Sequence, residues 1–154
     1  MIKEKTSNPP KEESTTHLEQ VLKSVDSIKA ARDMAAEHGK EQRPFSVLFN
    51  DYLAGHGLDA AEVYRLSGIN QNSVYGIVNG RTKHPGRDKL LALCIACGMS
   101  AEELNRTLRS CGVNALYPKN RRDIIIAGCI NSGMRDVVKI NIALDEEGLE
   151  PLDV

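Results

Sequence analysis

Three consecutive polar residues, Gln71, Asn72 and Ser73, open a short helical pattern in the middle of the chain. Glutamine and asparagine amides pair bidentately with the N6 and N7 edge of adenine, and a serine hydroxyl hydrogen-bonds to a base edge or a phosphate. At the start of a helix, these side chains therefore have the chemistry needed to contact bases in the major groove of DNA. The alternative interpretation is a solvated helix face without a ligand.

Cationic side chains follow the polar triplet. Segment 81–89 holds four Lys or Arg residues against one Asp. Such a loop can bind phosphates and position a duplex without reading its sequence, whereas a solvated charged loop is the alternative. The whole chain has a net charge of −1 and a pI of about 6.4, so it carries no global basic field. Any phosphate-binding surface must be local.

A turn at Gly68 positions the polar triplet. Two short helical patterns flank Ser67-Gly68-Ile69, and the second ends at Asn79-Gly80. Glycine adopts a positive φ without a Cβ penalty, so the chain can leave one helix and enter the next at a steep angle. Apolar residues that would pack the two helices together are Val63, Ile69, Val74 and Ile77. This spacing is typical of a helix-turn-helix, whose second helix enters the major groove.

Capping signals and glycine stops extend the pattern to five helices. Asp59 and Asn70 are expected to cap the second and third, after a first apolar stripe that begins at Phe45. Pro85-Gly86 precedes a fourth over 87–96, and the capping box Ser100 to Glu103 opens a fifth that closes by Gly112. The chain has no Trp and few strand-like alternations, so we expect an all-α fold.

The segments before residue 45 have a different composition. Residues 1–14 are polar and are expected to be disordered. Residues 15–39 are expected to form an amphipathic helix with a capping box from Thr16 to Glu19, and 40–44 read as a linker. The apolar stripe of this helix packs on the rest of the domain or, alternatively, forms a short dimerisation seam.

Cys94 and Cys97 form a CxxC pair inside an apolar helical stretch without a knuckle turn or a nearby His. We expect these thiols to pack in the core, and a metal or redox site is the less favoured alternative. No phosphate-binding glycine loop, Ser/His/Asp order or His/Glu metal motif is present, so we expect no enzyme, cofactor or metal. No apolar run is long enough to span a membrane, and no signal-peptide pattern is found, so we expect a cytoplasmic protein.

Taken together, residues 45–110 resemble the lambda-repressor-like, or XRE-family, helix-turn-helix domain. The resemblance is carried by Leu58 to Glu62, Leu66 to Val74, Ile77 to Gly80, Pro85, and Leu90 to Leu104. It implies that Gln71, Asn72, Ser73 and Tyr75 face the bases. It also implies backbone contacts by residues around the recognition helix and the following loop: Asn70, Arg81, Lys83, His84 and Arg87.

Three positions depart from the usual pattern of this family. Tyr64 stands where relatives carry a small residue, so it should splay the two helices or fill a changed gap. Ala60 replaces a polar residue that in many relatives supports the first base contact. Gly76 lies inside the recognition helix, where it costs about 1 kcal/mol relative to Ala and permits close approach of another backbone segment.

The last third of the chain repeats the two helices before it. Segment 87–99 aligns with 122–134, with seven of thirteen positions identical. The likeness continues with a one-residue shift, which pairs Leu116 with Leu152. We therefore expect a C-terminal helical hairpin within 113–154 that shares a core with its copy and offers a face for dimer contacts or a partner helix. A chance likeness is the alternative.

Lys119, Arg121 and Arg122 lie near the start of this repeated hairpin, where the helix dipole disfavours cations. They predict a patch for an anionic partner, either DNA backbone or an acidic protein. Alternatively, Asp123 and the acidic segment 145–147 neutralise them internally. The run from Leu116 to Asp123 also resembles the C-terminal extension of a bacterial XRE-type subgroup, which implies no established activity.

The interpretation that joins these features is a transcriptional regulator. It would place a recognition helix over 70–79 in the major groove of double-stranded DNA, as a homodimer on half-sites about one turn apart. The alternative is an adaptor that uses the helix-turn-helix scaffold, residues 45–112, for protein contacts.

Overall fold

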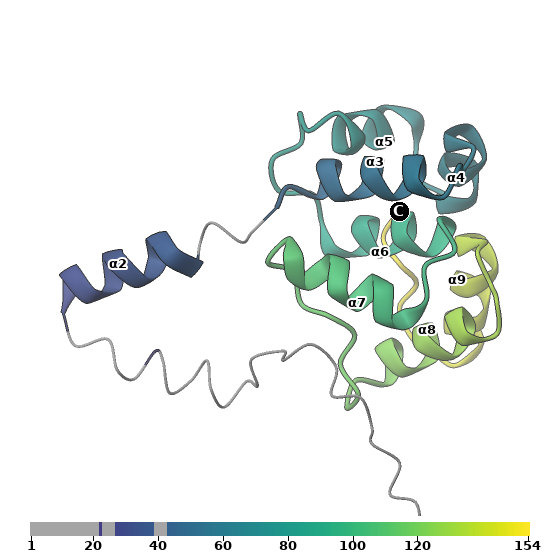
Figure 1. The fold of residues 1–154 in the computed structure, drawn as a ribbon. Coiled ribbons are helices and arrows are strands. Elements are labelled where there is room, and N and C mark those ends of the chain that lie inside the picture. Colours follow the sequence, from purple (N-terminus) through teal and green to yellow (C-terminus); the bar gives the residue numbers. More distant parts are fainter. Residues whose placement is uncertain (1–21, 23–26, 39–42) are drawn as a thin grey trace, which may run out of the picture. The chain divides into compact units, whose positions relative to one another are not determined.

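The computed structural model describes residues 22, 27–38 and 43–154 of the chain, and these contain helices and turns but no strand. The chain divides into two compact units between Glu41 and Gln42. The helices of the second unit are α3 (Phe45–Gly55), α4 (Ala60–Ser67), α5 (Gln71–Val78), α6 (Arg87–Ala96), α7 (Ala101–Ser110), α8 (Arg121–Asn131) and α9 (Val137–Glu146). The predicted all-α class is confirmed (Figure 1).

In the first unit, the structure describes one complete helix, α2 (Ile28–His38). Its first turn is capped by the Ser27 hydroxyl, which accepts a hydrogen bond from the Ala30 amide at 3.1 Å. Leu22 and Ile28, which belong to the predicted apolar stripe, are exposed. The predicted capping box at Thr16 and the rest of the stripe lie outside the described residues.

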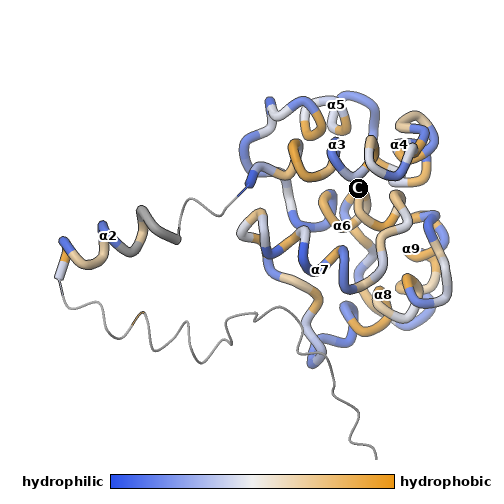
Figure 2. The backbone as a smooth tube through the Cα atoms, in the orientation of Figure 1, coloured by the Kyte–Doolittle hydropathy of each residue, from blue (hydrophilic) through white to orange (hydrophobic). Residues whose placement is uncertain are grey.

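Helix α6 forms the centre of the second unit. Every residue from Leu90 to Cys97 is buried, and α4, α7 and α9 all pack on this helix. Its apolar stretch lies among the surrounding helices in Figure 2. A helix covered on all sides requires apolar residues all round, which explains why this segment shows no polar face.

The CxxC pair belongs to this core, as predicted. Burial raises the pKa of the Cys94 thiol, and it raises that of Cys97 to about 12. Both side chains therefore stay protonated at neutral pH, whereas metal binding requires the thiolate. Within the part of the chain that the structure describes, no three His, Cys, Asp or Glu residues gather as a metal site. None of the described helices has the length and apolar character needed to cross a bilayer.

The sequence repeat is also a structural repeat. In the first copy, the side-chain oxygen of Asn105 on α7 accepts a hydrogen bond from the backbone amide of Leu116, which follows the hairpin α6–α7, at 2.9 Å. In the hairpin α8–α9, Asn141 accepts from Leu152 in the same way at 2.8 Å. The apolar residues of both hairpins belong to one hydrophobic core, which confirms the shared core expected from the sequence.

The second hairpin packs directly on the helix-turn-helix. Helix α9 contacts α4, and the side chains of Val138 and Val154 lie close to Gly68, in the turn between α4 and α5. The Asp88 carboxylate accepts a hydrogen bond from the Asp153 amide at 3.0 Å, which holds the C-terminal residues against the start of α6. Segments 45–112 and 113–154 therefore form one packed body.

Candidate nucleic-acid interface

The turn between α4 and α5 has the geometry that its sequence predicts. Gly68 ends α4 with φ of 70° in the left-handed region, where a side chain would be strained. The Asp59 carboxylate caps α4 by accepting a hydrogen bond from the Ala61 backbone amide at 3.1 Å. The side-chain oxygen of Asn70 caps α5 by accepting one from the Ser73 backbone amide at 2.9 Å. The four apolar residues that were expected to join the helices are all buried: Val63, Ile69, Val74 and Ile77.

Helix α5 has one buried side and one exposed polar side. Val74, Ile77 and Val78 face the core. The predicted base-contacting residues lie on the same helix, with Gln71, Asn72 and Tyr75 exposed and Ser73 half-buried. A short helix fixed by its apolar face can present its first-turn side chains to a major groove without rearrangement.

The Tyr64 side chain packs between aromatic residues of α3 and α5. Its ring stacks on Phe49 at a centroid distance of 6.5 Å and meets the edge of Tyr75 at 6.1 Å. Of the two outcomes predicted for Tyr64, the structure therefore shows the filled gap. The Tyr75 hydroxyl in turn accepts a hydrogen bond from the side-chain amide (Nε2) of Gln71 at 3.1 Å.

The loop after α5 is held tightly against that helix. The Thr82 amide donates to the Gly76 carbonyl at 2.9 Å, and a Cβ at Gly76 would lie 2.7 Å from the Thr82 hydroxyl. The glycine is thus required for the close approach expected from the sequence. The side-chain oxygen of Asn79 accepts hydrogen bonds from both the backbone amide and the Nε of Arg81, which fixes the start of the loop.

Lys83 and His84 line a groove of about 500 Å³ between this loop and the start of α3. The same groove contains Ser46 and Arg43, which is 52% exposed and pairs with Asp51 at 3.1 Å. Sequence reasoning missed both: Arg43 was assigned to the linker 40–44, and Ser46 to the first apolar stripe. No local signal identifies them, since only the folded chain brings the start of α3 to the loop after α5. The groove combines three cationic or imidazole side chains with hydroxyl groups, which is the composition that suits phosphate oxygens.

Two of the predicted cationic side chains, Arg87 and Arg122, already have ion-pair partners inside the molecule. Arg87 pairs with Asp123 at 3.0 Å and also donates to the carbonyls of Asn114 and Ala115. Arg122 pairs with Asp88 at 2.7 Å, so its partner is neither Asp123 nor the segment 145–147. A contact of either guanidinium with DNA phosphates or an acidic protein would have to compete with these partners.

The remaining cations of the predicted C-terminal patch, Lys119 and Arg121, are exposed. They lie beside the start of α8, at the end of the second unit away from α5 (Figure 1). This separation from α5 favours the acidic protein over the DNA backbone among the two partners considered for this patch.

Comparison with known families places a DNA-binding domain on the helices that carry these side chains. Residues 49–107, from within α3 to within α7, match the family model described as the Cro/C1-type HTH DNA-binding domain. No curated protein and no solved structure gives a significant match to the chain. The match falls inside the segment that resembled this family in sequence, and α4 and α5 form its helix-turn-helix. Residues 49–107 of this chain are thus a Cro/C1-type helix-turn-helix DNA-binding domain.

Proposed function

We propose that the protein is a cytoplasmic transcriptional regulator that reads operator DNA with α5 in the major groove. The observation that carries this proposal is the first turn of α5. Gln71 and Asn72 are exposed there, and the rest of the helix is anchored in the core. Their amides match adenine N6 and N7 in geometry and hydrogen-bonding capacity. Ser73 contributes a contact to a base edge or a nearby phosphate.

The proposed backbone contacts flank α5. Arg81, Lys83 and His84 are exposed in the loop that follows the helix, and Asn70 lies at its start. Arg43 and Ser46 extend the set across the groove. Arg87 would join this set only in competition with its ion pair to Asp123. These groups would fix the register of the duplex, whereas the base contacts would choose the sequence.

Selection of DNA fragments by the purified full chain tests this proposal. We expect enrichment of one site, palindromic or nearly so if two copies bind as a dimer on half-sites about one turn apart. Affinity for the enriched site should fall steeply with salt, because phosphate neutralisation releases counterions.

The variant Lys83→Ala tests whether a contact to the DNA backbone contributes affinity without contributing sequence preference. This variant should weaken binding to the enriched site and to unrelated DNA alike, and it should lower the salt slope by about one. The matched control is Lys139→Ala, which removes an exposed cation on α9 and should leave both affinities unchanged. A selection that returns no enriched site, with only weak salt-sensitive binding to any DNA, would contradict the proposal.

A further inference from the structure

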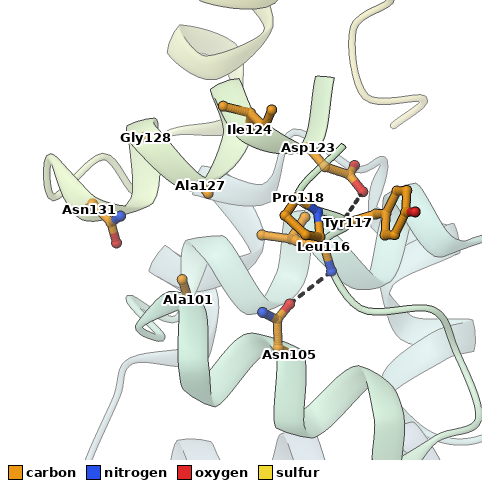
Figure 3. Close-up of a pocket in the computed structure, with 10 residues that line it drawn as sticks. All are labelled: Ala101, Asn105, Leu116, Tyr117, Pro118, Asp123, Ile124, Ala127, Gly128 and Asn131. Atoms are coloured by element: carbon orange, nitrogen blue, oxygen red, sulfur yellow. Dashed lines mark hydrogen bonds between the residues drawn. The ribbon is translucent and has the colours of Figure 1, made fainter. Parts of the chain in front are cut away.

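A second groove lies between α7 and α8, apart from the nucleic-acid interface. Its volume is about 420 Å³, which is within the range of roughly 300–1,000 Å³ typical of ligand pockets. Figure 3 shows the residues that line it: Ala101, Asn105, Leu116, Tyr117, Pro118, Asp123, Ile124, Ala127, Gly128 and Asn131. They come from α7, from the connection to α8, and from α8 itself.

The polar groups at the base of this groove already have partners. The Asn105 carbonyl accepts from the Leu116 amide, and the Asp123 carboxylate accepts from the Tyr117 amide at 2.9 Å (Figure 3). Asp123 is also neutralised by Arg87. The groove thus presents mainly apolar surface, and an occupant would not need to supply a polar group to its floor.

Small residues keep the groove open. Ala101 lies on the α7 side, and Ala127 and Gly128 lie on the α8 side. A Cβ at Gly128 would meet no atom of the described residues within 4 Å. Glycine in a helix costs about 1 kcal/mol relative to alanine, and packing against the part of the chain that the structure describes does not require it here.

The rim of the groove combines apolar and cationic groups. Tyr117 is 57% exposed and Ile124 is 49% exposed, both large fractions for side chains of this size. Lys119 and Arg121 lie two and four residues after Tyr117 and are exposed, and neither has an ion-pair partner among the described residues. The start of α8 adds positive helix-dipole potential to these two charges.

We propose that the α7–α8 groove is a docking site for a short acidic peptide segment of a partner protein. A bulky apolar side chain of the segment occupies the space beside Gly128 and Ile124. Its Asp or Glu residues lie against Lys119 and Arg121. Charge complementarity selects this occupant, because the rim is cationic and the floor carries no free charge. Helix α8, which forms one side of the groove, lies at the end of the unit away from α5, so DNA and the segment would bind at different helices (Figure 1).

Selection of short random peptides displayed on phage against the full chain tests the proposal, followed by fluorescence anisotropy with the enriched peptide. We expect enriched sequences to combine Asp or Glu with a Leu, Phe or Trp anchor. Their affinity should fall about tenfold or more in Lys119→Glu/Arg121→Glu, because like charges then face each other. Lys139→Glu reverses an exposed charge on α9 and should bind the peptide like the wild type.

Gly128→Leu tests the groove itself. The position is exposed in a regular helix, and leucine is a better helix former than glycine, so the fold should be retained, as thermal unfolding will show. The added side chain should fill the space and block the peptide, while DNA affinity stays unchanged. The proposal is overturned if no peptide is enriched, if enriched peptides lack acidic residues, or if Gly128→Leu binds them as tightly as the wild type. None of these results depends on DNA binding.

Discussion

At the scale of single residues, the orientation of Gln71 depends on a row of aromatic rings. Phe45 stacks on Phe49 at 5.5 Å, Phe49 on Tyr64 at 6.5 Å, and Tyr64 meets Tyr75 edge-on at 6.1 Å. The row ends at the hydrogen bond from the Gln71 amide to the Tyr75 hydroxyl. Tyr75 was predicted to contact bases. The structure shows a hydrogen bond that also allows it to position its neighbour one helical turn away.

Tyr75→Phe should therefore relax the sequence preference of the protein without unfolding it. The variant keeps the ring contacts and removes the oxygen that accepts from Gln71. We expect a loss of about 1 kcal/mol of discrimination at one base pair, with affinity for unrelated DNA unchanged. Competition binding with single-base variants of the enriched site measures this. Tyr64→Phe, which alters a hydroxyl with no part in this bond, is the control. An unchanged profile for Tyr75→Phe would show that Gln71 is oriented in some other way.

At the scale of helices, two reciprocal ion pairs join the repeated hairpins. The dipeptide Arg87-Asp88 opens α6, and the dipeptide Arg122-Asp123 lies in the first turn of α8. Each Arg pairs with the Asp of the other copy, and the four side chains are between 5% and 27% exposed. Removal of one partner leaves the other buried charge uncompensated, which is more damaging than loss of the pair as a whole.

A charge swap tests this arrangement. Arg122→Asp and Asp88→Arg should each destabilise the fold by about 3 kcal/mol, because like charges then face each other in a half-buried site. The double variant should recover part of the loss. Urea unfolding gives the free energies, with Arg121→Asp at an exposed position as the control. If the single and double changes were simply additive, the two side chains would not interact.

The same pair predicts a pH dependence. Burial alone raises the pKa of Asp88, but the hydrogen bonds from Arg122 and the Asp153 amide outweigh it and lower the pKa below its usual value. The folded pKa is thus below the unfolded one, so the contribution to stability is present above about pH 4 and is lost as the pH falls further. The difference in unfolding free energy between wild type and Asp88→Asn should therefore shrink between pH 7 and pH 3. A constant difference would contradict the proposed cause.

At this scale, the sequence predicted interactions between residues that are close together in the chain and missed those between residues far apart. The caps at Asp59 and Asn70 are confirmed, as is the capping box of Ser100 and Glu103. Each involves residues within three positions of one another, so the sequence alone can reveal it. The partners of Arg87 and Arg122 lie more than thirty residues away in sequence. The sequence therefore did not predict these partners, although the repeated Arg-Asp dipeptide was visible: Arg87 was interpreted as a DNA contact, and Arg122 as part of a patch for an anionic partner or a partner of Asp123 and segment 145–147.

At the scale of the whole molecule, the C-terminal hairpin is part of the DNA-binding body. Its buried apolar residues complete the core around α6: Ile126, Cys129, Ile130, Val137, Ile140, Leu144 and Leu152. The repeat predicted a shared core. It did not predict that α9 and Val154 would lie against the turn at Gly68, because repeats predict a similar shape and not the surface on which the second copy packs.

Removal of residues 113–154 should therefore abolish the fold of the domain that matches the Cro/C1 family. Without the hairpin, the side chains of α4 and α6 that face α9 become exposed to water, at about 1.5–3 kcal/mol for each aliphatic side chain that is fully uncovered, whereas a whole domain is stable by only about 5–15 kcal/mol. We expect the truncated chain to lack a cooperative thermal transition by circular dichroism. A truncated chain that melts cooperatively near the temperature of the full chain would show that the hairpin is dispensable.

Helix α5 is the element that we propose reads DNA. The most direct measurement is the affinity of wild type and Gln71→Ala/Asn72→Ala for the enriched site and for a scrambled site at one salt concentration. We predict that the double variant loses about 1–3 kcal/mol of preference for each amide removed, while its affinity for scrambled DNA is retained. A double variant that kept the full preference of the wild type would contradict the account, because another surface would then read the bases.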